Sequence, residues 1–235
     1  MERVISCTVL AYLREHDMIT KQQHGFLSRK STTTSLLDSL NDCSLAIKRK
    51  RYVDVAFIEF AKAFDSVSHS KLFAKLQYYA TILWYYWQPT YMDYKFIIKS
   101  NHKTRVGSAY STRLDLKSGI VQGSCVGPLL FIIYINDVAD LFNWNIKCSL
   151  YADDVKLYSV IDSEDDCIIL QSVIDELVAW SVKWQLKISY TKCMTSRIGL
   201  RVTNMHFYHI CNDLMPSPVI VRDLGILVDR KLNFS

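Results

Sequence analysis

The adjacent acids Asp153 and Asp154 constrain the fold of this chain more than any other feature. They lie between two short runs, residues 147–151 and 155–158, that carry β-branched and aromatic side chains. Such runs predict two strands joined by a tight turn, with the acids at the tip of the hairpin. Two neighbouring carboxylates repel each other, and a divalent cation such as Mg²⁺ would relieve that repulsion. The alternative is a surface hairpin whose acids are only solvated.

A second acidic site follows the strongest strand pattern in the first half of the chain. Residues 52–60 run Tyr-Val-Asp-Val-Ala-Phe-Ile-Glu-Phe, which places Glu59 near the end of the predicted strand. Asp65 follows after a short turn into a helix. An acid at either position can also cap a helix or be solvated. A functional role for Glu59 therefore requires that its strand end meet the hairpin acids.

The remaining segments predict helices and short strands. Apolar residues at helical spacing predict helices within residues 1–19, along 36–47, along 72–79, after Pro128, and from Ser163 to Trp184. Strand patterns predict a hairpin over 94–106 with residues 100–102 at its tip, and strand pieces at 186–188, 195–200, 219–221 and 225–228. This order of elements predicts the α+β class with a mainly antiparallel sheet.

Composition limits the class of protein. Half of the 235 residues are hydrophobic and 22% are charged, which predicts a well-packed core in one large domain or two small lobes. The net charge of +5 favours an anionic partner. Seven cysteines without a C-x-x-C pair favour reduced thiols in an intracellular protein, nuclear or cytoplasmic and not secreted. The apolar segment 81–98 carries a proline and two charges, so we expect no membrane span.

Two loops have the composition of ligand-binding segments. Arg29 and Lys30 lie among small hydroxyl residues, which could contact phosphates or simply lead into a helix N-cap. The segment 117–128 holds three glycines and a proline, which would allow the backbone to approach something flat or anionic. The basic run 48–51 suits a solvated helix end or a nucleic-acid contact.

In their order along the chain, these motifs resemble the reverse transcriptases of non-LTR (LINE-type) retrotransposons. Residues 23–26 with 31–33 resemble the family's fingers motif, and 58–65, 118–137, 151–154 and 184–193 resemble its four palm motifs. Residues 223–229 resemble its primer-grip hairpin. A group II intron maturase shares the Ala-Asp-Asp core, but Gly-Pro-Leu-Leu-Phe followed by Ile-Asn-Asp argues against it.

The resemblance implies a right-hand polymerase palm, in which an antiparallel sheet packs on helices, with part of the fingers and no thumb. It places partial fingers at 1–51, the palm at 52–201 with a fingers-like insertion around 81–117, and the primer-grip region at 202–235. It also implies RNA-directed DNA polymerase activity, in which a primer 3′-hydroxyl takes a nucleotide from a dNTP on an RNA template. RNA template, DNA primer and dNTP are the implied partners.

The resemblance also assigns roles to individual residues. It implies that Glu59 and Asp153 hold two Mg²⁺ ions, or Mn²⁺, with Asp154 beside them, and that Lys192 donates a proton to the leaving pyrophosphate. Phe64 corresponds to the gate that rejects a 2′-hydroxyl. The other implied contacts are with substrate at Phe60, Gln122 and Gly123, and with nucleic acid at Arg29, Lys30 and Gly225.

The chain departs from the family pattern where the chemistry depends on it most. The family carries aspartate where this chain has Glu59, whose carboxylate lies about 1.5 Å farther from the backbone, one C–C bond length. Val121, Ala61 and Ala80 replace the usual proline, serine and glycine. The chain also begins inside the fingers and stops after the primer grip. We therefore expect impaired polymerase activity; the alternative is a catalytically dead palm that only binds nucleic acid.

Overall fold

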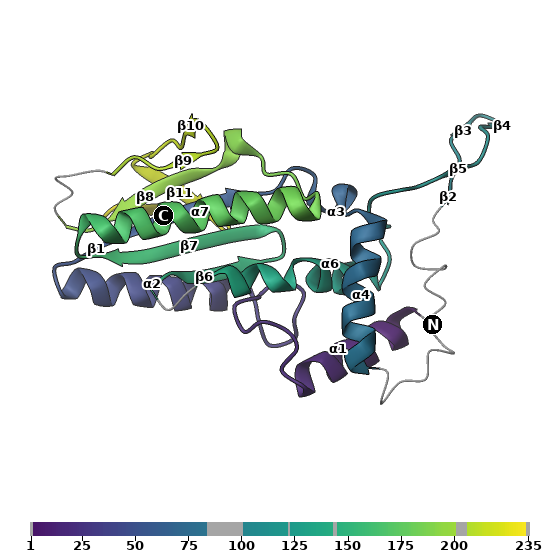
Figure 1. The fold of residues 1–235 in the computed structure, drawn as a ribbon, viewed down its shortest axis with the longest axis horizontal. Helices are drawn as coiled ribbons and strands as arrows, with labels where there is room; N and C mark the ends of the chain where they lie inside the picture. The colour runs from purple at the N-terminus through teal and green to yellow at the C-terminus, as the bar shows by residue number, and fades with distance from the viewer. Residues whose placement is uncertain (1, 84–100, 122, 143–144, 201–205, 234–235) are drawn as a thin grey trace.

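A computed structural model describes residues 2–83, 101–121, 123–142, 145–200 and 206–233. Its centre is a four-stranded antiparallel sheet in the order β6-β7-β1-β8 (Figure 1). The strands are β6 (Lys147–Tyr151), β7 (Asp154–Ile161), β1 (Tyr52–Glu59) and β8 (Met194–Ile198). The predicted α+β class with a mainly antiparallel sheet is confirmed.

Helices cover both faces of this sheet. The long helix α7 (Glu164–Trp184) packs on one face together with α6 (Gly127–Ile135) and the 3₁₀ helix η2 (Asn136–Leu141), and α2 (Thr32–Lys48) packs on the other (Figure 1). Beyond one end of the sheet lie α1 (Glu2–Glu15) and α4 (His69–Leu83), with the short α3 (Ala63–Ser66) after β1. None of the helices described is both long and apolar enough to span a bilayer.

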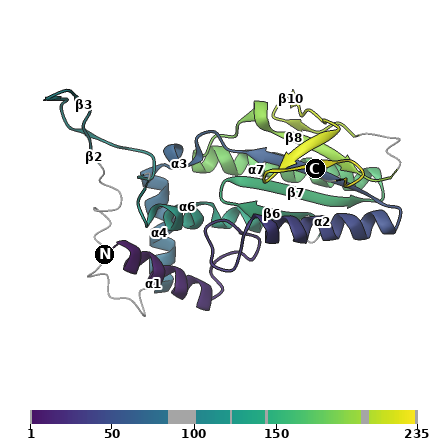
Figure 2. The same cartoon turned by 180° about the vertical axis from the view of Figure 1, so that it is seen from behind.

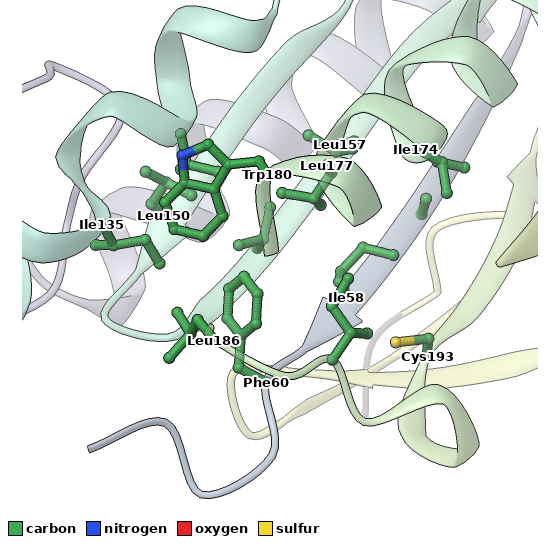
Figure 3. Packing of buried hydrophobic residues seen from close by; sticks show 14 of the residues in the cluster. Ile58, Phe60, Ile135, Leu150, Leu157, Ile174, Leu177, Trp180, Leu186 and Cys193 are labelled. Carbon is green, nitrogen blue, oxygen red and sulfur yellow. The ribbon is translucent and has the colours of Figure 1, made fainter. Parts of the chain in front are cut away.

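Strand β1 lies at the centre because it is apolar on both sides. Ala56 and Ile58 face the α7 side and join the main core, whereas Val53 and Val55 join the smaller core under α2. Successive side chains of a strand point to opposite faces, so a strand covered on both faces is a nearly continuous apolar run. Figure 3 shows Ile58 pointing into the main core.

The predicted helix starts are confirmed. Ser31 and Thr34 form a capping box at α2, with Thr34 N–H donating to Ser31 Oγ over 3.2 Å. Ser163 N–H donates to the Asp166 carboxylate over 2.9 Å at α7. Pro128 lies in the first turn of α6, where its missing N–H leaves no helical hydrogen bond unmade.

The hairpin predicted over residues 94–106 has a different tip. Residues 94–100 lie outside the described residues, but Asn101 and His102 form strand β2, which pairs with β5 (Leu114–Asp115). Inside this ladder, β3 (Arg105–Val106) pairs with β4 (Ala109–Tyr110) around Gly107, whose φ is +60°. Glycine adopts this conformation readily, so the chain reverses there. The resulting ribbon projects from the body of the molecule (Figure 1).

Two further hairpins follow β8. The first pairs β9 (His209–Ile210) with β10 (Asp213–Leu214), and the second pairs β11 (Ile220–Asp223) with β12 (Ile226–Asp229). The second hairpin lies over the sheet on the side away from α7 (Figure 2). The strand piece predicted at 186–188 is reduced to one bridge between Ile188 and Phe60, because the 3₁₀ helix η3 (Tyr190–Lys192) follows at once.

A buried ion pair joins β1 to β8 within the main sheet. Arg197 donates to Asp54 through Nε over 2.6 Å and through Nη2 over 2.5 Å. The Tyr208 hydroxyl donates to the same carboxylate over 2.6 Å. Asp54 is 2% exposed, so these donors replace the water that its charge would otherwise need.

Replacing Asp54 with Ala should destabilise the fold by about 3–5 kcal/mol, because the buried charge of Arg197 would lose the Asp54 carboxylate. Urea unfolding followed by circular dichroism measures the change. The matched control is Asp162→Ala, which breaks the exposed pair between Arg51 and Asp162 and should cost less than about 1 kcal/mol. Equal losses in the two variants would contradict the assignment.

Candidate active site

The candidate site lies where β1 ends beside the hairpin turn between β6 and β7. In the antiparallel ladder, Glu59 is the direct partner of Asp154. Residues directly opposite in such a ladder project to the same face of the sheet, so these two carboxylates share one face. Asp153 occupies the turn itself. The structure therefore brings together the acids that the sequence predicted from two distant segments.

A cavity of about 120 Å³ opens on this face of the sheet. Its charged and polar lining comes from six segments: Ser35, Glu59, Ser149, Tyr151, Asp154, Lys156, Lys192, Arg222 and Asp223. Asp65, the other acid near the end of β1, is exposed on α3 and is not part of this lining. Of the acidic site predicted at the end of β1, Glu59 with Asp65 nearby, only Glu59 lines the cavity.

The pKa values of the hairpin acids are raised. Although Asp154 is accessible to solvent, burial raises its pKa to about 6, with the charges of Asp153 and Glu59 adding to it. Burial also raises the pKa of Asp153, against the hydrogen bond from its own backbone N–H, and the charge of Glu59 raises it further. These carboxylates repel one another, which is the condition that a bound cation relieves.

Lys192 supplies a positive charge to the site. Its ammonium forms an ion pair with Glu59 from η3, across the end of β1. That hydrogen bond, followed by the charge of the carboxylate, raises the pKa of Lys192. The predicted catalytic residues Glu59, Asp154 and Lys192 all line one cavity, with Asp153 beside them in the turn.

The acids are oxygen ligands of the kind that Mg²⁺ prefers, but among the described residues they do not form a complete metal site. Within the part of the chain that the structure describes, no three Asp, Glu, His or Cys side chains form a complete metal site by themselves. Mg²⁺ in phosphoryl-transfer sites is held by one or two carboxylates together with substrate phosphates and water. Glu59 and the hairpin acids provide such a partial set.

Sequence reasoning missed Lys156, which connects three elements around the cavity. Its ammonium donates to Ser39 on α2 over 2.8 Å and forms an ion pair with Asp223 on β11. Lys156 is 7% exposed, so these partners replace the water that its charge would otherwise contact. The sequence could have indicated this, because Lys156 is two positions after Asp154 on a predicted strand and therefore lies on the same face.

Phe60 does not contact the cavity with its side chain. Its ring is 2% exposed and packs 6.1 Å from Trp180 in the main core (Figure 3). Phe60 follows Glu59 along the chain and therefore points to the opposite side. A substrate contact at Phe60 would therefore involve its backbone rather than its ring, and it stays a prediction.

Phe64 and the glycine-rich segment lie next to each other. The Phe64 ring stacks on Phe131 with centroids 4.4 Å apart, and Ile120 N–H donates to the Phe64 carbonyl over 2.8 Å. Gly123 is exposed with φ +84°, and Gln122 lies outside the described residues. Their substrate contacts stay predictions.

The predicted nucleic-acid residues lie on loops. Arg29 is exposed with φ +66°, whereas the Lys30 ammonium donates to the Lys21 carbonyl within the same loop. Gly225 has φ +94° in the turn between β11 and β12, where a side-chain carbon would have no atom within 4 Å of it. A nucleic-acid contact at these three positions stays a prediction.

Comparisons with known proteins agree with the predicted family. A family model described as reverse transcriptase (RNA-dependent DNA polymerase) matches residues 1–212. Two similar proteins are the probable RNA-directed DNA polymerase from transposon BS of Drosophila melanogaster, 26% identical, and the RNA-directed DNA polymerase from mobile element jockey of Drosophila funebris, 25% identical. The alignments cover 99% and 100% of this chain but 26% of each relative, so the chain spans about a quarter of their length.

The fold is similar to that of telomerase structures. Apo telomerase from Candida tropicalis matches with a TM-score of 0.66 at 12% identity, covering 100% of this chain and 40% of that one. Telomerase from the same organism with the TWJ fragment of telomeric RNA gives 0.63 at 12% identity, covering 100% and 36%. The predicted polymerase palm is thereby confirmed as a fold.

Replacing Asp154 with Asn should stabilise the fold at pH 8 and change it little at pH 4. The pKa of Asp154 is about 6 when folded, against an ordinary value of 3.8. The folded state thus holds the proton more tightly, and the stability linked to it falls as the pH rises from about 4 to about 6. Asn carries no charge to be repelled, although solvent screens part of the effect.

Urea midpoints at pH 4 and pH 8 measure this difference. The control is Glu176→Gln on the exposed side of α7, which should shift both midpoints equally. A lower midpoint for Asp154→Asn at pH 8, or an identical shift at both pH values, would show that the Asp154 carboxylate is not repelled in the site.

Proposed function

Because this chain belongs to the reverse transcriptase family, we propose that its site extends a DNA primer by copying an RNA template. The observation that carries the proposal is the register that sets Glu59 opposite Asp154 with Asp153 at the adjoining turn. Carboxylates from a strand end and a hairpin tip must meet if they are to share cations, and these do.

The cations would be two Mg²⁺ ions, or Mn²⁺, held by Glu59 and Asp153 with Asp154 beside them; when bound, they stabilise charge on the attacking and leaving oxygens. The primer 3′-hydroxyl oxygen forms a bond to the α-phosphorus of the dNTP as the bond to pyrophosphate breaks. Lys192, which pairs with Glu59 at the edge of the site, would donate a proton to that pyrophosphate. The hydroxyl proton leaves to solvent.

Phe64 supports discrimination between deoxyribose and ribose. Its stacking on Phe131 fixes the ring, and a fixed ring rejects a 2′-hydroxyl by steric conflict better than a mobile one.

RNA template, DNA primer and dNTP are the proposed partners, with Arg29, Lys30 and Gly225 near the nucleic acid and Gln122 and Gly123 near the nucleotide. All seven cysteines are free thiols, which supports a nuclear or cytoplasmic location.

The pair between Lys192 and Glu59 favours a second candidate function. Here the carboxylate that should receive a cation already has the Lys192 ammonium as its partner. Glutamate is also longer than the aspartate that the family carries, and a misplacement near 1 Å can cost about a hundredfold in rate. The alternative is therefore a palm that binds RNA or DNA without catalysis.

The Glu59→Asp change should raise primer extension by up to about a hundredfold, because it withdraws the carboxylate toward the family's position. Extension of an oligo primer on poly(rA) with Mg²⁺ or Mn²⁺ measures the rate. Asp153→Ala is the control and should abolish extension in either background. No gain over the parent would show that the length of the Glu59 side chain does not limit the rate.

A gel shift on primer–template, run beside the extension assay, separates the two candidate functions. Binding without extension by the parent and by Glu59→Asp supports the non-catalytic palm. Extension that depends on Asp153 supports the polymerase, and neither binding nor extension would contradict both.

A further inference from the structure

The segment around Gln23 lies against the catalytic hairpin from the side opposite to Glu59's strand. Gln23 forms a parallel bridge with Leu150, next to the hairpin turn. His24 N–H donates to the Leu150 carbonyl over 2.7 Å, and Leu150 N–H donates to the Gln22 carbonyl over 2.9 Å. The outer edge of β6 is therefore paired at the point where the chain approaches the acids.

The residue that follows this edge has an unusual backbone conformation. Ala152 precedes Asp153 and has φ +56°, a left-handed conformation that is unfavourable for a residue other than glycine. Such a conformation persists only where surrounding contacts impose it. It also determines the direction in which the chain presents the next two side chains.

The Gln23 side chain holds this residue through its backbone. Its Oε1 accepts from Ala152 N–H over 2.9 Å and from Gly25 N–H over 2.7 Å, while its Nε2 lies 3.4 Å from the Ala152 carbonyl. Gln23 is 1% exposed, so water does not compete for these contacts. One amide thus engages both backbone groups of Ala152.

Gly25 makes room for this arrangement. A side-chain carbon on Gly25 would lie 2.3 Å from the Ala152 nitrogen, a distance that no real contact reaches. Glycine is therefore required here by the close approach of two backbones. The Gln23 amide and the missing side chain of Gly25 act on the same turn.

From these contacts we infer that Gln23 is a positioning residue, whose amide fixes the left-handed Ala152 turn and so directs Asp153 and Asp154 toward Glu59. This inference rests on the proposed function, because it assigns Gln23 a role in cation binding by those acids. Groups that orient metal ligands without touching the metal commonly change metal affinity by about 10–100-fold when replaced. Gln23 should have an effect of this size.

The test replaces Gln23 with Met, which keeps the length of the side chain but removes the acceptor. Mn²⁺ affinity is measured by titration calorimetry, and exchange of the Ala152 amide hydrogen by NMR. The matched control is Gln22→Met, one position earlier, whose exposed side chain accepts from Thr20 and not from the turn. Leu13→Ala, in the separate core around α1, controls for destabilisation alone.

We expect Gln23→Met to weaken Mn²⁺ binding by about 10–100-fold and to speed exchange at Ala152, with neither effect in the two controls. Gln23→Asn, whose amide is withdrawn from the turn, is used if the Met variant does not fold. An affinity within twofold of the parent, or unchanged exchange at Ala152, overturns the inference. Failure of the parent itself to bind Mn²⁺ would count against the proposed function. Exchange of the Ala152 amide hydrogen would then test only whether Gln23 holds the Ala152 turn.

Discussion

The pairing register of β1 with β7 is the constraint on which the site depends. It sets Glu59 directly opposite Asp154, and a slip of one residue would turn every side chain of β1 to the other face. That slip would turn Ala56 and Ile58 away from the main core, in which both are buried. The free energy of packing the sheet therefore also keeps Glu59 opposite Asp154.

Several features of the site destabilise the folded state, and contacts with neighbouring elements offset that cost. Burial and mutual repulsion raise the pKa of Asp154 to about 6, and Ala152 is held in a left-handed conformation beside it. Lys156 links the hairpin to α2 and β11 through Ser39 and Asp223. Such unfavourable features are tolerated at functional sites where the rest of the fold over-determines the local structure.

Sequence patterns predicted the acids and the main elements because these depend on local chemistry. The apolar run of β1, the capping box at Ser163 and the acidic hairpin each need only a few neighbouring residues. The burial of Phe60 and the ion pair of Lys156 with Asp223 depend on contacts between distant segments, whereas the tip at Gly107 is a local turn placed wrongly by the strand pattern. Periodicity can assign Phe60 to a face of its strand, but only the packing of α7 shows that this face is closed.

The two candidate functions differ by a single methylene group. The longer side chain of Glu59 extends past the end of β1 and meets Lys192, whereas aspartate would end about 1.5 Å nearer the backbone, one C–C bond length. The same extra carbon thus displaces the carboxylate from the family's position and supplies it with a partner that competes with a cation. Because Lys192 stands on η3 rather than on the sheet, it can change its position without disturbing the strand register. The fold therefore keeps Glu59 opposite Asp154 whichever partner the Glu59 carboxylate has.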